Sequence, residues 1–190
     1  MKDAKSFEIY RHLVMEAYKR VKANKGAAGV DDVSIADFES NLKSNLYKIW
    51  NRMSSGSYFP PAVKLVEIPK SNGGKRPLGI PTIGDRVAQM VVVMTIEPGI
   101  EPYFHEDSYA YRPNRSALDA VRKAKERSYT FHWVLDLDIK GFFDNIDHGL
   151  LIKALERHVK CEWAMLYIKR WLSVPYQLKD GTQIAVSYTH

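Results

Sequence analysis

Residues 133–148 read Trp-Val-Leu-Asp-Leu-Asp-Ile-Lys-Gly-Phe-Phe-Asp-Asn-Ile-Asp-His. The first half of this stretch alternates between apolar and acidic residues, which predicts a β-strand with one apolar face and one face that carries two aspartates. The apolar face, which should pack on a core, consists of Leu135, Leu137 and Ile139. On the opposite face, Asp136 and Asp138 would stand roughly 7 Å apart, because a strand rises ~3.3 Å per residue.

The predicted strand ends at Lys140 and Gly141, where a glycine lets a ligand or a second backbone approach closely. A carboxylate at the end of a buried strand, followed by backbone N–H groups and a lysine, suits a divalent metal ion that carries a phosphate chain. The alternative is an edge strand whose acidic side chains are solvated, and an isolated Asp-x-Asp pattern would favour that alternative.

The longer string from Asp138 to His148 resembles motif A of the reverse transcriptases encoded by bacterial group II introns, almost letter for letter. The resemblance implies that Asp138 is a catalytic carboxylate that binds Mg²⁺ in a two-metal site, with the backbone carbonyl of Ile139 as a further ligand. It also implies that Phe143 screens the 2′-position of the incoming sugar. The backbone that lines the triphosphate pocket would be that of Lys140, Gly141 and Phe142.

A second stretch, residues 62–80, predicts a β-hairpin, because two strand-like runs flank the turn Asn72-Gly73-Gly74. Cations gather near its tip, and they suit a polyphosphate, since arginine binds two oxygens at once and lysine acts as a point charge. These cations are Lys70, Lys75 and Arg76. A merely solubilising tip is the alternative. The string from Ile68 to Pro81 resembles the first fingers motif of the same family, in which the hairpin closes over the incoming nucleotide.

A third stretch, residues 109–121, reads Tyr-Ala-Tyr-Arg-Pro-Asn-Arg-Ser-Ala-Leu-Asp-Ala-Val, and Ser116 with Asp119 forms a predicted helix capping box. Tyrosines beside arginines can stack on bases while the arginines hold phosphates. The alternative is that Tyr111 belongs to the core and that Arg112 pairs with an internal acid. The string resembles the second motif of the family. The residues that this resemblance assigns to template or primer contact are Arg112, Asn114 and Arg115.

The rest of the pattern predicts more helices and one more hairpin. Apolar residues at helical spacing predict helices over about 5–24, 35–53, 83–97, 149–158 and 163–171. Ser34 with Asp37 forms a capping box for the second of these helices, and Pro98 is expected to end the third. The Asp180-Gly181 turn predicts a hairpin near the end of the chain.

Composition sets broad limits on the class of protein. The 190 residues are 45% hydrophobic and 26% charged, with a net charge of +6, which suits a globular protein and permits nucleic-acid binding. Cys161 is the only cysteine, so a disulfide framework and a cysteine-based zinc site are excluded. No apolar run approaches ~18 residues and the first residues do not resemble a signal peptide, so we expect no membrane partner. The single cysteine fits a reducing cytoplasm, and the resemblance implies that this cytoplasm is bacterial.

These observations together predict an α+β fold, namely the fingers and the first part of the palm of a right-hand polymerase, in one reverse-transcriptase domain. The predicted parts are an N-terminal helix and template-side loop (1–33), fingers (34–85), a palm-proximal helix with the third stretch and the motif A strand (86–147), and a return to the fingers (148–190). The sequence contains neither the Pro-Gln-Gly nor the Tyr-x-Asp-Asp motif of the family. We therefore expect part of a longer domain that is inactive by itself, because two-metal chemistry needs carboxylates from more than one place.

The function implied by the resemblance is RNA-directed DNA synthesis by a group II intron protein, with an additional intron-binding or maturase role in the complete protein. Its partners would be an intron RNA template, a DNA primer and deoxynucleotides, and the resemblance is compatible with a homodimer. Three alternatives stay open. They are a reverse transcriptase of the retron or diversity-generating type, a maturase that has lost polymerase activity, and a non-catalytic module that binds RNA or dimerises.

Overall fold

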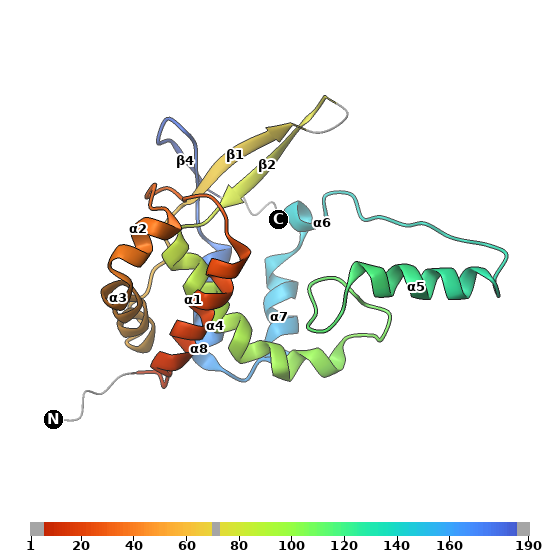
Figure 1. Cartoon of the computed structure of the whole chain (residues 1–190), viewed down its shortest axis with the longest axis horizontal. Coiled ribbons are helices and arrows are strands. Elements are labelled where there is room, and N and C mark those ends of the chain that lie inside the picture. The colour runs from red at the N-terminus through yellow and green to blue at the C-terminus, as the bar shows by residue number, and fades with distance from the viewer. Residues whose placement is uncertain (1–5, 70–72, 186–190) are drawn as a thin grey trace.

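The computed structural model describes residues 6–69 and 73–185, apart from the side chains of Phe143 and Asp144 (Figure 1). The predicted α+β fold is confirmed. The helices are α1 (Arg11–Asn24), α2 (Ile35–Ser40), α3 (Leu42–Ser54), α4 (Ile83–Ile100), the short 3₁₀ helix η1 (Glu101–Tyr103), α5 (Ala117–Ser128), α6 (Phe142–Asn145), α7 (His148–His158) and α8 (Glu162–Leu172). The strands are β1 (Val63–Pro69), β2 (Lys75–Ile80), β3 (Tyr176–Gln177) and β4 (Gln183–Ile184).

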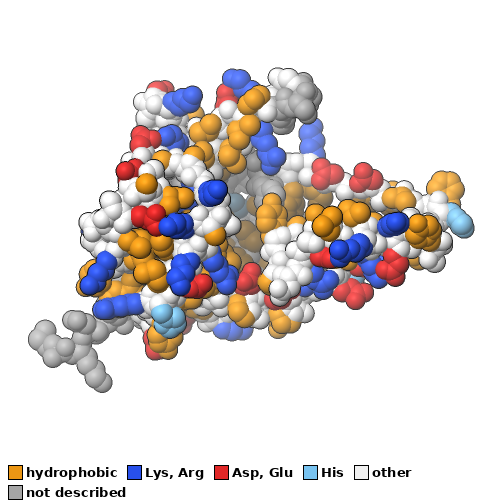
Figure 2. Space-filling model, in the orientation of Figure 1, with side chains coloured by type: hydrophobic (Ala, Val, Ile, Leu, Met, Phe, Trp, Pro, Cys, Tyr) orange, Lys and Arg blue, Asp and Glu red, His pale blue; other side chains and the backbone are white. Residues whose placement is uncertain are grey.

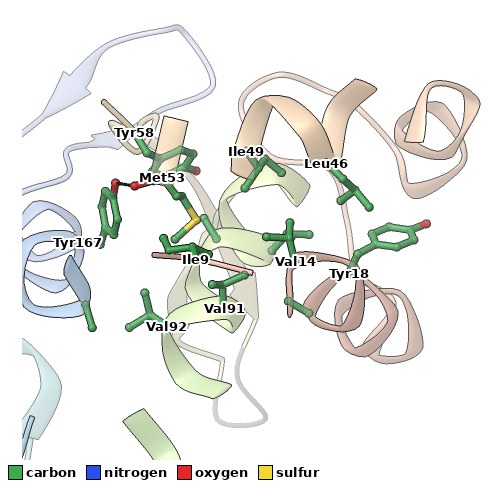
Figure 3. Close-up of a cluster of buried hydrophobic side chains, with 14 of the residues drawn as sticks. Ile9, Val14, Tyr18, Leu46, Ile49, Met53, Tyr58, Val91, Val92 and Tyr167 are labelled. Atoms are coloured by element: carbon green, nitrogen blue, oxygen red, sulfur yellow. Dashed lines mark hydrogen bonds between the residues drawn. The ribbon is translucent and has the colours of Figure 1, made fainter. Parts of the chain in front are cut away.

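The hydrophobic core lies between α1, α3, α4 and α8, whose buried side chains meet in one cluster (Figure 3). In α1 the predicted apolar spacing produces a single buried face, formed by Val14, Ala17, Tyr18 and Val21. Helix α4 is apolar on most of its surface and passes through the middle of the cluster, as expected for a helix that is covered on several sides. The core therefore belongs to the helical body, and the hairpin of β1 and β2 projects from it (Figure 1).

The small sheet has the strand order β2-β1-β3-β4. Strands β1 and β2 pair antiparallel, with Ile68 opposite Arg76, so the predicted hairpin is confirmed. Strand β1 also pairs parallel with β3, which joins the hairpin to the chain that follows α8. Gly79 lies at this junction, where an added Cβ would come within 2.8 Å of a methyl group of Val63. The short pairing of β3 with β4 confirms the predicted C-terminal hairpin.

Three predicted helix boundaries were wrong. The first helix, expected from about residue 5, begins only at Arg11. The predicted helix over 35–53 is divided at Asn41, whose φ of −132° and ψ of 41° interrupt the helix between α2 and α3. The side-chain amide of Asn45 donates to the carbonyl of Phe38 at 3.0 Å, which satisfies one acceptor at the break. Pro98 does not end α4, because proline removes only its own N–H, and the N–H of Glu101 still donates to the carbonyl of Glu97.

The predicted strand over 134–139 does not form. Leu135 and Leu137 are each 81% exposed and Ile139 is 69% exposed, and the segment has no regular secondary structure. The alternation is present in the sequence, but a strand is stabilised by the ladder of a neighbouring strand, and the described sheet contains only β1 to β4. Helix α5 and the returning residues 129–141, which we call the arm, extend away from the helical body (Figures 1 and 2).

Candidate nucleotide-binding and catalytic site

The carboxylate of Asp138 lies on the returning part of the arm and is exposed. Within the described residues, neither Asp136 nor Asp138 forms an ion pair or a side-chain hydrogen bond, so both carboxylates are free to meet a ligand. The chain then turns at Gly141, which has a left-handed conformation with φ of 60° and precedes α6. The backbone N–H and side-chain amide of Asn145 both donate to the Gly141 carbonyl, at 3.0 and 2.8 Å. Glycine suits this turn because it adopts positive φ without a steric penalty.

The residues after the turn were predicted to line the triphosphate pocket and to screen the sugar. Lys140 is exposed, and Phe142 begins α6 with its side chain half exposed. The backbone of Phe143 belongs to α6, but its side chain lies outside the described part of the chain. The sugar-screening role of Phe143 therefore stays a prediction.

The described residues fit only part of a magnesium site. They contain no group of three or more histidine, cysteine, aspartate or glutamate side chains that could hold a metal ion. Mg²⁺ prefers octahedral oxygen ligands and usually takes only one or two carboxylates from a protein. Asp138 and the carbonyl of Ile139 could supply oxygen ligands of this type, and the rest of the site would have to come from other groups.

The hairpin presents its described cations in two different ways. Lys75 Nζ lies 2.6 Å from Glu67 Oε2, and this hydrogen bond raises the pKa of Lys75. Both side chains are well exposed, so the pair contributes little to stability and can exchange for another anion. Arg76 is exposed and has no ion pair with a described residue. Lys70 lies outside the described residues, so Arg76 is the hairpin cation that the structure leaves most open to a phosphate.

Arg112 has an internal role, in contrast to its predicted contact with nucleic acid. Its Nε and Nη2 donate to Glu101 Oε1 at 3.0 and 2.7 Å, and its Nη1 donates to the carbonyls of His105 and Ser108, each at 2.7 Å. Only 7% of the side chain is exposed, and the guanidinium lies over the ring of Phe104. Arg112 therefore follows the alternative prediction, in which it pairs with an internal acid.

Because the hydrogen bonds of Arg112 hold the loop from its inner side, the rest of the third stretch faces outward. Tyr111 is fully exposed, so the idea that it belongs to the core was wrong. Tyr111 and Asn114 both have positive φ, at 57° and 58°, a conformation that is uncommon for residues other than glycine and that clusters at functional sites. The guanidinium of Arg115 lies 5.6 Å from the centre of the Tyr109 ring. Asn114 and Arg115 are therefore available to a ligand, whereas Arg112 holds the loop that presents them.

A shallow depression of about 350 Å³ adjoins this loop. It is lined by Tyr109, Asn114, Arg115, Asp119, Arg122, Lys123 and Glu126. Asp119 is engaged by the capping box at the start of α5, as predicted, and its hydrogen bonds with Ser116 lower the pKa of Asp119. Two of its three cations pair with its own acids, Arg122 with Asp119 at 2.8 Å and Lys123 with Glu126 at 3.2 Å. Arg115, beside the Tyr109 ring, is therefore the cation of the depression that could meet a nucleic-acid backbone with an adjacent base.

Replacing Arg112 by alanine should destabilise the fold by about 2–3 kcal/mol, because Glu101 and the two loop carbonyls would lose their donors. Urea denaturation followed by circular dichroism measures this change. The matched control is Arg115→Ala, which should change the free energy of unfolding by less than about 0.5 kcal/mol, since the side chain is exposed. Equal losses in the two variants would contradict the internal role of Arg112.

The N-terminal loop, predicted to lie on the template side, packs against the start of α4. An added Cβ at Gly29 would lie 2.6 Å from the backbone nitrogen of Thr82, so only glycine allows this approach. Arg86 donates from Nε to the carbonyl of Pro81 at 3.1 Å and from Nη2 to the carbonyl of Ala27. These contacts place the loop next to the end of β2, and its contact with a template stays a prediction.

Comparison with known proteins shows which family carries these features. The family described as "Reverse transcriptase (RNA-dependent DNA polymerase)" matches residues 68–190, which is more than half of the chain. The chain belongs to the reverse transcriptase family. The matched residues include the end of β1, the loop that contains Arg115 and the segment that contains Asp138. The resemblance that the three sequence motifs indicated is thereby confirmed.

Curated relatives of this reverse transcriptase chain include intron-encoded proteins. "Protein YkfC" of Escherichia coli K12 is 38% identical over 151 residues, which cover 76% of this chain and 40% of the relative. "Group II intron-encoded protein LtrA" of Lactococcus lactis is 34% identical over 177 residues, which cover 88% of this chain and 29% of the relative. The chain therefore spans less than half the length of these relatives.

A solved structure supports the fold. A chain of a "Cas6-RT-Cas1--Cas2 complex" aligns with a TM-score of 0.51 and 21% identity, over 92% of this chain and 18% of the other. This likeness concerns the fold alone. Within the described residues of the reverse transcriptase chain, no helix has the length and apolar character that a membrane crossing requires.

Proposed function

We propose that the protein to which this chain belongs is an RNA-directed DNA polymerase of the group II intron type. The observation that carries this proposal is the family match over residues 68–190, which includes the end of β1, the strand β2, the Arg115 loop and the Asp138 segment. An intron-encoded relative at 34% identity supports the intron type. An intron-binding or maturase role in the complete protein belongs to the same proposal.

Each exposed group has a role in this proposal. Arg76, with Lys70 and Lys75, neutralises the triphosphate of an incoming deoxynucleotide, and the backbone from Lys140 to Phe142 lines its pocket. Asn114 and Arg115 hold the backbone of the RNA template or the DNA primer. Arg115 is exposed and has no ion pair with a described residue, so it can bind a phosphate without breaking an internal salt bridge. Arg112 would first have to leave Glu101, which favours Arg115 over Arg112.

Asp138 and the carbonyl of Ile139 are proposed as ligands of Mg²⁺. The ions, when bound, would stabilise the attacking and leaving oxygens of the phosphoryl transfer. The described residues offer only part of such a site, so we expect that residues 1–190 alone do not polymerise nucleotides. The remaining carboxylates would come from a segment like the Tyr-x-Asp-Asp motif of the family.

A non-catalytic RNA-binding role is the second candidate. It is favoured by one observation, namely that the described residues include the whole Arg115 loop and the depression beside it, whereas they offer only part of a metal site. The two candidates share the RNA contact and differ in nucleotide incorporation.

Primer extension on an RNA template separates the two candidates. We expect a protein that carries this chain and extends to the length of its relatives to make DNA from deoxynucleotides, and a chelator of divalent ions to stop it. The 190-residue chain should bind structured RNA at low salt, with affinity that falls steeply as salt rises, and should incorporate nothing. Binding without synthesis by the longer protein would replace the polymerase by the RNA-binding role, and absence of both would overturn both.

In the longer protein, Phe143→Ala should lower the preference for deoxynucleotides over ribonucleotides by about tenfold or more, because the ring is proposed to block the 2′-hydroxyl. Single-nucleotide incorporation with each sugar measures the ratio. The matched control is Phe142→Ala. Only the backbone of Phe142 is proposed to line the pocket, so the loss of its ring should leave the ratio unchanged. An unchanged ratio in Phe143→Ala would remove the screening role.

A further inference from the structure

Arg86 connects the N-terminal loop, residues 25–33, to the base of the hairpin. Its Nε donates at 3.1 Å to the carbonyl of Pro81, which directly follows β2, and its Nη2 donates to the carbonyl of Ala27 in the loop. Arg86 lies near the start of α4, next to the buried Asp85. One side chain that is anchored in the helical core thus holds two segments that are far apart in the sequence.

The backbone of the loop is shaped to receive this side chain. Gly26 has a φ of 124°, which other residues rarely adopt, and an added Cβ there would lie 2.6 Å from Nη1 of Arg86. Gly29 touches the start of α4 directly, since an added Cβ would lie 2.6 Å from the backbone nitrogen of Thr82. The loop therefore packs closely on both Arg86 and the first residues of the core helix.

The loop also borders the face of the hairpin that carries Arg76. Side chains alternate between the two faces along a strand, whereas residues paired across two strands share a face. Lys64 shares the face of Ile68 by this alternation, and Ile68 is paired with Arg76. Lys64 Nζ lies 2.6 Å from Asp32 Oδ1 of the loop. The loop thus meets the hairpin on the side of the arginine that is proposed to bind the triphosphate.

Arg86 itself is poorly placed to bind a phosphate. Its side chain is half-buried, and its donors are directed at the carbonyls of Ala27 and Pro81. Burial lowers the pKa of Arg86, and the negative charge of Asp31 in the loop opposes this shift. The protein therefore already supplies the acceptors and a compensating charge, which indicates a residue that positions other groups and does not bind the substrate.

We propose that Arg86 is a positioning residue, which fixes the hairpin against the N-terminal loop and so keeps Arg76 in place for the incoming nucleotide. This inference rests on the proposed polymerase function. Because the hairpin projects from the helical body (Figure 1), it would sample further orientations once this connection is lost. The apparent affinity for nucleotide then falls with the fraction of protein that is competent to bind, whereas bound nucleotide selects the competent orientation. The loss of Arg86 should therefore raise KM and largely preserve kcat.

Single-nucleotide incorporation by the longer protein tests the role of Arg86. Arg86→Gln should raise the KM for deoxynucleotide about fivefold or more and change kcat by less than about twofold. The matched control is Arg20→Gln, which loses only a partly exposed ion pair with Glu97 at 4.0 Å and should keep the wild-type KM. A merely structural role would lower the fraction of folded protein, so kcat would fall at constant KM. That result, or unchanged kinetics, would overturn the proposal.

A change on the loop side separates positioning from direct binding of the nucleotide. Gly29→Ala should displace the loop from Thr82 without altering the Arg86 side chain, and should also raise KM. The double variant should have a KM within about twofold of the worse single variant, because both changes break the same contact. A wild-type KM in Gly29→Ala, combined with a raised KM in Arg86→Gln, would mean that Arg86 binds the nucleotide itself and would overturn the positioning role.

Hydrogen exchange of the 190-residue chain tests the contact without any DNA synthesis. The N–H of Asp32 donates to the carbonyl of Gly29 at 3.3 Å inside the loop. We expect the amides of residues 26–33 to exchange about tenfold faster in Arg86→Gln, whereas those of α1 keep their rates. Equal exchange in the two proteins would overturn the contact. If the longer wild-type protein made no DNA, the proposed function would fail, and faster exchange would still show that Arg86 holds the loop.

Discussion

Asp138→Ala is expected to reduce primer extension by at least about a thousandfold in the longer protein, while the binding of RNA is retained. The reason is that a two-metal site stabilises charge that develops only in the transition state, and Asp138 is the carboxylate proposed as its ligand in this chain. The RNA contact is proposed for the Arg115 loop, which the change does not touch. Primer extension and filter binding, measured on the same preparation, give the rate of DNA synthesis and the affinity for RNA.

Asp136→Ala is the matched control for this prediction. Asp136 lies two positions away, is also exposed, and also forms no ion pair with a described residue. Neither substitution should change the free energy of unfolding by more than about 0.5 kcal/mol, so a difference in activity reports chemistry and not folding. Retained extension in Asp138→Ala would remove Asp138 from the site, and an equal loss in Asp136→Ala would show that the assignment between the two acids is wrong.

The parts of the fold that the sequence predicted correctly are those encoded by residues close to each other in the chain. The capping boxes at Ser34 and Ser116 form as expected, because a side chain and a backbone N–H three residues apart suffice to make them. Asp147 makes a contact of the same local kind at the start of α7, where it accepts from the N–H of Leu150 at 2.8 Å. The hairpin of β1 and β2 also forms as expected from two strand-like runs that flank a turn.

The parts that failed depend on partners elsewhere in the chain. Alternation over 134–139 shows which side chains share a face but not whether a neighbouring strand exists, and the described structure has none. Arg112 looks the same in sequence whether it meets a phosphate or Glu101, which precedes it by 11 residues. The acid-rich run over 97–107 was the available signal, since its acids pair with Arg112 and Arg127.

Sequence reasoning missed the most important buried polar group. In the sequence, Asp85 stands out only as an acid in the first turn of a predicted helix, where it favours the helix dipole. In the structure it is 1% exposed and accepts hydrogen bonds from Tyr58, which precedes it by 27 residues, and from Trp171, which follows it by 86. Its carboxylate thus joins α4 and α8 to the segment that leads into β1.

Asp85→Ala is expected to destabilise the fold by about 3–5 kcal/mol. The change would leave the hydroxyl of Tyr58 and the indole N–H of Trp171 without their acceptor, from which they lie 2.7 and 2.8 Å, and would also release the side-chain amide of Gln89. The matched control is Asp85→Asn, which keeps one acceptor oxygen and should lose only about 1–2 kcal/mol. Urea denaturation of the three proteins measures the difference, and equal losses would show that the amide oxygen of asparagine cannot replace the carboxylate as the acceptor of these hydrogen bonds.

The pH dependence of stability provides a sharper form of the same test. Burial raises the pKa of Asp85 above its ordinary value of 3.8, although hydrogen bonds from Trp171, Tyr58 and Gln89 oppose the shift. A raised pKa means that the folded protein holds this proton more tightly than the unfolded chain does, so the contribution of Asp85 to stability falls as pH rises above about 3.8.

The variant Asp85→Asn isolates this effect, because the asparagine side chain does not titrate and all other groups titrate alike in both proteins. The free energy of unfolding of the wild type relative to Asp85→Asn should therefore be larger at about pH 4 than at about pH 7. A relative stability that instead rises with pH would mean that the hydrogen bonds outweigh burial and that the buried carboxylate stabilises the fold as an anion.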